Sequence, residues 1–215
     1  MRDTSDPFSR FSGIVETPSE LTDIVGTPPA FVVDKELDRL DDLCREFIAA
    51  SPFCLIATAG RDGHIDISPK GDPAGFVQVL SDTMLAIPDR PGNRRTDTFH
   101  NLLENDRIGL IFLIPGKGET LRVRGRGRIV RDDALRETMA INGKAPKLAL
   151  VVHVTEAFLH CPKCIARSHL WQPDAWGETA HLADIRLATS RHANRPEPIE
   201  ELDAWAKREG LIELY

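Results

Sequence analysis

Three arginines, Arg90, Arg94 and Arg95, occur in one short stretch, IPDRPGNRRTD, residues 87–97. Gly92 and Asn93 tolerate unusual backbone angles, so they allow successive amide groups to point into one concavity. A helix is predicted to begin near Asp97, and its first amides add the positive end of a helix dipole. Guanidinium groups, exposed amides and a helix N-terminus all favour a dianionic phosphate. The alternative is a solvated turn whose arginines pair with Asp89 and Asp97.

A second polar pair, Ser68 and Lys70, lies upstream in the stretch DISPKGDPAGF. The two residues are two apart at the end of a predicted strand, so both side chains face the same side. A hydroxyl and an ammonium group in that place could reach the phosphate bound by the arginine turn, or a ring carbonyl. The alternative is an ordinary strand end that leaves Lys70 exposed.

Cys161 and Cys164 have the spacing of a metal-ligand pair. A structural zinc site usually needs two such pairs, and the further ligands would have to come from His160, His169, His153 and Cys54. A thioredoxin-type redox pair is disfavoured, because that motif opens a helix after a strand in a parallel sheet. No metal is therefore included in the predicted site.

The stretch ETLRVRGRGRIVRD, residues 119–132, alternates strictly between arginines and apolar or glycine residues. A strand with this period has one buried face and one arginine face. Four arginines in a row on one face could form a nucleic-acid stripe, but few aromatic residues accompany them and the chain is acidic. A salt-bridged outer face is the better interpretation.

The bulk composition is that of a globular protein, with 215 residues, 41% hydrophobic and 28% charged. The net charge of -6 excludes a general binder of nucleic acids or anionic membranes, so any basic site must be local. Neither an apolar run long enough to cross a membrane nor the apolar centre of a signal peptide is present, so a cytoplasmic protein with reduced cysteines is expected.

Short β-rich runs dominate the middle of the chain, and few helices interrupt them. Hairpins are predicted around GRDG, residues 60–63, and around Ser81 and Asp82. Further strands are expected within 107–116, 119–132 and 147–160, and helices over 34–50, 96–106 and 199–210. This pattern predicts a mainly β, Greek-key-like antiparallel barrel with peripheral helices. The expected organisation is an irregular arm over 1–33, a barrel domain over 34–175 and a helical extension over 176–215 packed on the same domain.

The order of these segments, from SPKGD and TMLAIPDRPGNRR to NLLENDRIGLIFLIPG, ETLRVRGRGRI and CPKCIARSHLW, resembles the pyridoxamine 5'-phosphate oxidase-like superfamily of FMN-binding split barrels. The similarity is greatest to the branch of pyridoxamine 5'-phosphate oxidase-related, FMN-binding proteins, and it covers about residues 36–175. The resemblance implies a split barrel and a homodimer with FMN between the subunits. The leading hypothesis adds small-molecule electron partners, namely a reductant such as a nicotinamide and an unknown small acceptor.

The resemblance also implies a set of FMN-contacting residues. Arg94 and Arg95 match the basic pair that holds the FMN phosphate, with Arg90 and Asn93 in the same turn. Ser68 and Lys70 lie where the preceding strand contacts the phosphate or the edge of the ring, and Ile87 and Pro88 lie along the cofactor. Thr120, Arg167 and Trp171 match positions that approach the flavin from the partner subunit.

The C-terminal tail, KREGLIELY, departs from the true oxidases, which carry a tryptophan and an arginine-containing motif for the substrate phosphate. The expected function is therefore that of an FMN-dependent oxidoreductase on an unknown small molecule rather than a pyridoxamine phosphate oxidase. A non-catalytic protein that stores or senses flavin or haem is the alternative, and four histidines, His64, His153, His160 and His169, leave haem open.

Overall fold

Strand β6, Thr120–Val130, lies at the centre of the sheet and has the alternation that its sequence predicts. Leu121, Val123, Gly125 and Gly127 are buried, whereas the arginines between them face outward. Three of these arginines form ion pairs: Arg124 with Glu156 at 2.9 Å, and Arg126 and Arg128 with Asp106 at 2.8 and 3.0 Å. The prediction of a salt-bridged outer face is confirmed.

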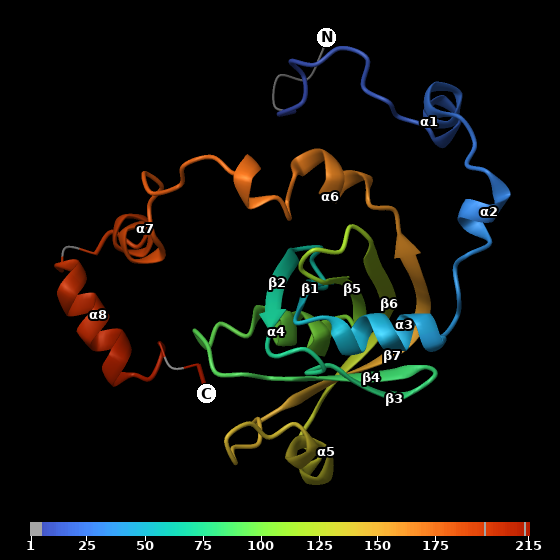
Figure 1. Ribbon diagram of the computed structural model, residues 1–215. Helices are drawn as coiled ribbons and strands as arrows, with labels where there is room; N and C mark the ends of the chain where they lie inside the picture. The colour runs from blue at the N-terminus through green and yellow to red at the C-terminus, as the bar shows by residue number, and fades with distance from the viewer. Residues whose placement is uncertain (1–5, 196, 213) are drawn as a thin grey trace. The chain divides into compact units, whose positions relative to one another are not determined.

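Seven strands form one sheet with every neighbouring pair antiparallel. The other strands are β1 (Phe53–Ala59), β2 (Ile65–Gly71), β3 (Gln78–Ser81), β4 (Met84–Pro88), β5 (Arg107–Leu113) and β7 (Ala149–His160). Their order is β2-β1-β5-β6-β7-β4-β3, so β2 and β3 remain edges and the sheet does not close (Figure 1). This is the mainly β split-barrel class predicted from the sequence.

The hairpin between β1 and β2 determines which side chains of β2 face inward. Gly63 takes a φ of +84°, as the predicted turn requires, and Ser68 pairs with Ile56 while Lys70 pairs with Cys54. Directly opposed residues in an antiparallel pair project from the same face of the sheet. Ser68 and Lys70 therefore project from the core-facing side, where Ile56 and Cys54 are fully buried.

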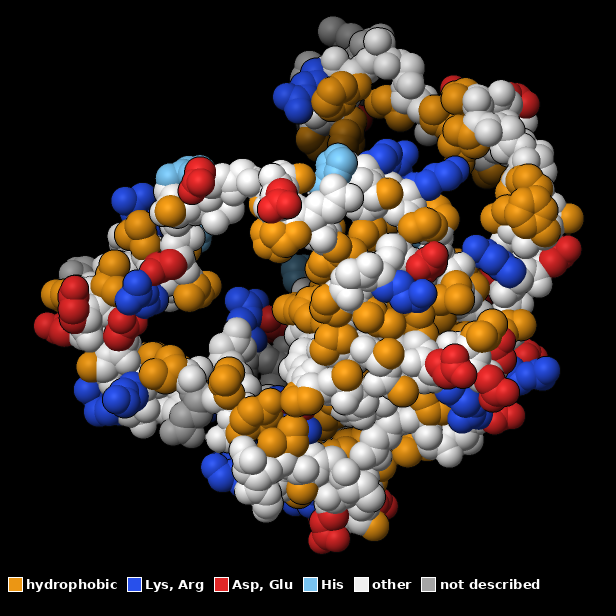
Figure 2. Space-filling view, in the orientation of Figure 1, with side chains coloured by type: hydrophobic (Ala, Val, Ile, Leu, Met, Phe, Trp, Pro, Cys, Tyr) orange, Lys and Arg blue, Asp and Glu red, His pale blue; other side chains and the backbone are white. Residues whose placement is uncertain are grey.

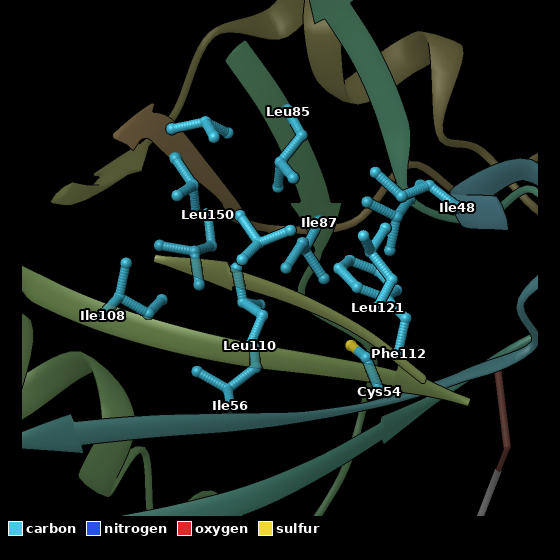
Figure 3. Packing of buried hydrophobic residues seen from close by; sticks show 14 of the residues in the cluster. Ile48, Cys54, Ile56, Leu85, Ile87, Ile108, Leu110, Phe112, Leu121 and Leu150 are labelled. Atoms are coloured by element: carbon cyan, nitrogen blue, oxygen red, sulfur yellow. The ribbon is translucent and has the colours of Figure 1, made fainter. Parts of the chain in front are cut away.

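The main hydrophobic core lies between the strands and the helices α3 (Asp42–Ala50) and α4 (Asp97–Glu104) (Figure 3). Helix α3 begins later than the sequence predicts, because Leu37 exchanges backbone hydrogen bonds with Ala157 of β7 and so lies in an extended bridge. The helix is instead capped by Asp41, whose carboxylate accepts a hydrogen bond from the Cys44 amide at 2.9 Å.

The structure is a computed structural model that describes residues 6–195, 197–212 and 214–215. It divides into two compact units, Met1–Glu36 and Leu37–Tyr215. In the first unit, the arm predicted to be irregular contains helices α1 (Pro18–Val25) and α2 (Ala30–Val33), neither with a buried residue. The remaining helices are α5 (Asp133–Thr138), α6 (Lys163–Ser168), η1 (Pro173–Ala175), α7 (Ile185–His192) and α8 (Ile199–Arg208). Among the described helices, none has the length and apolarity that crossing a bilayer requires.

Candidate functional site

A cavity of about 680 Å³ opens beside the edge strand β2. Its described lining comes from four segments: β2, the turn between β4 and α4 together with the first turn of α4, the loop between α5 and β7, and the C-terminus. Ligand pockets for cofactor-sized molecules have volumes of about 300–1,000 Å³. The cavity therefore has room for a nucleotide-like cofactor.

The β2 side of the cavity presents Ser68 and Lys70 together. The Lys70 ammonium donates a hydrogen bond to the Ser68 hydroxyl at 3.0 Å, which holds both groups at the cavity wall. Two residues earlier, the Asp66 carboxylate accepts a hydrogen bond from the Thr98 hydroxyl at 2.7 Å. Since Thr98 belongs to the first turn of α4, this bond ties the start of that helix to β2.

The turn before α4 contains two left-handed residues, and they are not Gly92 and Asn93, the residues that the sequence suggests for unusual backbone angles. Arg94 and Thr96 both have left-handed conformations, with φ of +63° and +54°, and the Arg95 amide donates to the Asn93 side chain at 3.1 Å. The side chain of Thr96, the N-cap residue, makes no capping hydrogen bond to the described chain. The first turn of α4 thus lines the cavity, and its N-cap residue supplies no side-chain acceptor to the first amides.

The three arginines of the turn have different surroundings. Arg94 and Arg95 are exposed. Arg95 pairs with Asp97 at 2.7 Å, which is one of the ion pairs expected for a solvated turn. Arg90 instead forms a 2.5 Å ion pair with Asp72, whose side chain is only 1% exposed, and donates to the Met139 carbonyl at 2.9 Å. Arg90 lines the cavity but has its Nε and Nη1 engaged by the protein.

The lining residues that the sequence did not assign to the site include Asp89, Lys144, Lys147 and Tyr215. The two lysines follow a tight turn in which Asn142 and Gly143 take positive φ values of 53° and 74°. The stretch NGKAPK carries that turn signal, so it could have drawn attention to them. Burial raises the pKa of Asp89, while the nearby charge of Lys70 opposes the shift.

The cavity is locally basic although the whole chain is acidic. Its described lining contains six basic residues, Lys70, Arg90, Arg94, Arg95, Lys144 and Lys147, against three acidic ones, Asp66, Asp89 and Asp97. On the face seen in Figure 2, basic and acidic side chains are scattered among one another without a continuous basic surface. The cationic lining is thus a local feature suited to an anionic ligand rather than part of a nucleic-acid surface.

Five residues of the predicted site do not line the cavity of this chain. Ile87 and Pro88 lie in β4, buried and paired with Leu150 and Ala149 of β7. Thr120 is buried at the start of β6, and Trp171 donates its indole N–H to the Lys117 carbonyl at 2.8 Å. Arg167 is exposed on α6. The structure thus brings together Ser68, Lys70, Arg90, Asn93, Arg94 and Arg95 only.

The cysteines and histidines lie away from the cavity. Cys54, considered above as a zinc ligand, is fully buried in the core, and burial raises the pKa of its thiol to about 12. Cys161 and Cys164 are exposed and free. Within the described residues, no cluster of three or more histidine, cysteine or acidic side chains could hold a metal, and no histidine lines the cavity.

Comparison with known proteins gives one family and several similar structures. The family model described as pyridoxamine 5'-phosphate oxidase matches residues 40–161. HupZ from Group A Streptococcus is 20% identical, with 55% of this chain and 92% of that chain covered and a TM-score of 0.45. A protein related to general stress protein 26, of the pyridoxinephosphate oxidase family, from Clostridium acetobutylicum is 20% identical over 54% and 84% of the two chains, with a TM-score of 0.39. HutZ, the heme storage protein from Vibrio cholerae, is 14% identical over 57% and 94%, with a TM-score of 0.40. No curated protein matches the chain.

Proposed function

The chain belongs to the pyridoxamine 5'-phosphate oxidase family, and on that premise we propose that it is an FMN-binding flavoprotein that acts as an FMN-dependent oxidoreductase. Flavin binding is typical of the family, whereas some relatives bind haem. The observation that carries the proposal is the cavity itself, where Arg94 and Arg95 lie beside the start of α4 and line the same space as Lys70.

The residues of the cavity suit the 5'-phosphate of FMN. Arg94 and Arg95 supply exposed guanidinium donors, and the first turn of α4 supplies amides and the positive end of its dipole. Arg90 has a different task in this proposal, since its buried pair with Asp72 fixes the beginning of the turn. The phosphate therefore binds to the two exposed arginines while Arg90 maintains their backbone.

FMN supplies the redox chemistry when it is bound, so the protein needs only to hold the phosphate, orient the ring and place donors at its edge. Lys70 is suited to the last task, because Ser68 holds its ammonium at the cavity wall and, within the described residues, the ammonium forms no ion pair with a carboxylate. A cation there stabilises negative charge on the ring. The electron donor and the acceptor are small molecules.

The predicted contacts that lie outside the cavity fit a homodimer. Thr120 and Trp171 lie near the beginning of β6, on a part of the chain that does not line the cavity. We assign Thr120, Arg167 and Trp171 to the cavity of the partner subunit. Dilution to monomers should then release the flavin, and flavin that stayed on a demonstrated monomer would contradict this assignment.

Haem is the competing cofactor, and it needs an axial ligand such as histidine, cysteine, methionine or tyrosine. The described lining of the cavity contains none of the first three, and its tyrosine, Tyr215, donates its hydroxyl hydrogen bond to Asp72. The cationic lining suits a phosphate better than a porphyrin iron.

The absorption spectrum of the purified protein tests the proposal. We expect flavin bands, with the released cofactor identified as FMN by mass. A colourless protein that stays colourless after incubation with FMN would refute the proposal, and a Soret band would indicate haem instead. If flavin is bound, anaerobic reduction followed by exposure to candidate acceptors separates an enzyme from a carrier.

A further inference from the structure

The end of the chain returns to the cavity after helix α8. Gly210 ends the helix with a φ of +67°, and the Leu211 amide donates back to the Ala206 carbonyl at 2.9 Å. Helix α8 has no buried residue, yet Gly210 and Tyr215 both line the cavity. In Figure 1 the marked C-terminus lies beside the loop between β4 and α4. The C-terminal tail is defined here as residues 209–212 and 214–215.

The tail has a strong contact at its end. The Tyr215 hydroxyl donates a hydrogen bond to Oδ1 of Asp72 at 2.8 Å, and Oδ2 of the same carboxylate receives the 2.5 Å contact from Arg90. Because the Asp72 side chain is only 1% exposed, water does not compete effectively for these bonds. Asp72 therefore links the end of the tail to the arginine turn.

The other end of the tail has a weaker contact. Nη2 of Arg94 donates to the Glu209 carbonyl at 2.7 Å, and Nη1 of Arg94 lies 3.8 Å from the Glu209 carboxylate. The two side chains are 68% and 46% exposed, so solvent screens this ion pair. The contact occupies Arg94, the residue assigned above to the FMN phosphate.

We propose that the C-terminal tail is a strap across the cavity, in which Tyr215 is the positioning residue that anchors it and the Glu209 contact with Arg94 is the end that opens. The inference rests on the proposed function for the identity of the ligand. A phosphate that binds Arg94 replaces the Glu209 carbonyl, so ligand entry is coupled to release of this end. The anchored end then limits how far the strap moves, which slows both entry and escape.

A titration of the tyrosine tests whether the anchor exists, independently of FMN. Tyr215 is the only tyrosine of the chain, so the ultraviolet absorbance of its phenolate reports on this residue alone. The hydrogen bond to Asp72 raises the pKa of the Tyr215 phenol, the charge of Arg90 opposes this shift, and Lys144 contacts the backbone carbonyl of the same residue. We expect the phenol to ionise at higher pH in the folded chain than in the urea-unfolded chain. Coincident titrations would overturn the proposal.

Exchange of FMN tests whether the anchor controls the cavity. In Tyr215→Phe, the stopped-flow rates of FMN association and dissociation should each rise at least about tenfold, because a hydrogen bond to a charged group is lost. The dissociation constant of FMN, which is the ratio of the two rates, should change less. Leu214→Ala is the control, because Leu214 precedes Tyr215 in the same tail and its side chain is 80% exposed. A Tyr215→Phe variant that is folded by circular dichroism and exchanges FMN at the wild-type rates would overturn the proposal.

A protein that binds no FMN would refute the proposed function, but it would not test whether Tyr215 anchors the tail across the cavity. In that case hydrogen exchange decides: Tyr215→Phe should increase deuterium uptake over residues 141–148, the loop that lines the cavity next to the tail. The Lys144 ammonium lies 3.4 Å from the Tyr215 carbonyl, which links this loop to the tail. Uptake equal to that of the wild type would overturn the strap.

Discussion

Replacement of Arg90 by alanine should destabilise the protein far more than replacement of its neighbours in the same turn. Arg90 is paired with Asp72 at 2.5 Å, and the Asp72 side chain is 1% exposed. Alanine would leave a buried carboxylate whose one remaining side-chain partner among the described residues is the Tyr215 hydroxyl, and would also remove the hydrogen bond to the Met139 carbonyl.

The magnitude follows from the burial of this pair. Removing one partner of a buried ion pair costs about 3–5 kcal/mol, because the remaining charge stays desolvated. For a domain of this size, each kcal/mol corresponds to about 2–4 °C in Tm, so the expected fall is about 6–20 °C. Arg95→Ala is the matched control, since its pair with Asp97 is exposed and contributes about 0–1 kcal/mol.

The assay is thermal unfolding followed by circular dichroism, with urea unfolding as a second measure. Adding Asp72→Asn to Arg90→Ala removes the unpaired charge and should recover part of the lost stability. Equal Tm values for the Arg90→Ala and Arg95→Ala variants would refute the division of the turn into a structural arginine and ligand-binding arginines.

Two further substitutions test the cavity and the sheet. The pKa of Asp89 is raised in the folded state, so its ionised form opposes folding at neutral pH. Below the unfolded pKa of about 3.9 the carboxyl group is protonated in both states, and this cost disappears. Asp89→Asn should therefore raise the urea midpoint at pH 7, with the gain vanishing toward pH 3.5, and should tighten FMN binding by on the order of 1 kcal/mol. A gain that persisted at pH 3.5 would contradict this reasoning. Gly125→Ala should cost about 3 kcal/mol or more in urea unfolding, because its Cβ would lie 2.1 Å from the His153 carbonyl oxygen, whereas the control Gly109→Ala meets nothing within 4 Å. Similar midpoints for the two glycine variants would show that β6 and β7 do not approach as closely as described.

Much of the fold could be predicted because its signals are local. The alternation along β6 and the glycine-containing turn at residues 60–63 determine strand and hairpin without any distant contact. The start of α3 could not be predicted in the same way. Leu37 fits a helical stripe, but a bridge to Ala157, far along the chain, takes it into extended structure. Tertiary pairing overrides the local pattern there.

The candidate site was predictable only in part, for the same reason. Arg94 and Arg95 could be found because they lie in one turn with its own composition. The engagement of Arg90 depends on Asp72, and the contact of the tail depends on Tyr215, which is 143 residues away from Asp72 in the chain. No periodicity or spacing in the sequence indicates a contact over that distance, so only the folded structure brings these residues together.

The dissociation constant of FMN for the double variant Arg94→Ala and Arg95→Ala shows whether these two arginines hold the phosphate of FMN. The variant loses two hydrogen bonds between charged groups, each contributing about 1.5–3 kcal/mol to FMN binding. A small part of this energy is offset in the wild type, because phosphate binding replaces the exposed pairs of the arginines with Glu209 and Asp97. We expect affinity to fall on the order of 100-fold or more with an unchanged Tm. The control, Arg124→Ala with Arg126→Ala, removes two arginines from the outer face of β6 and should bind FMN as the wild type does. Unchanged FMN affinity in the Arg94 and Arg95 variant would show that the phosphate binds elsewhere.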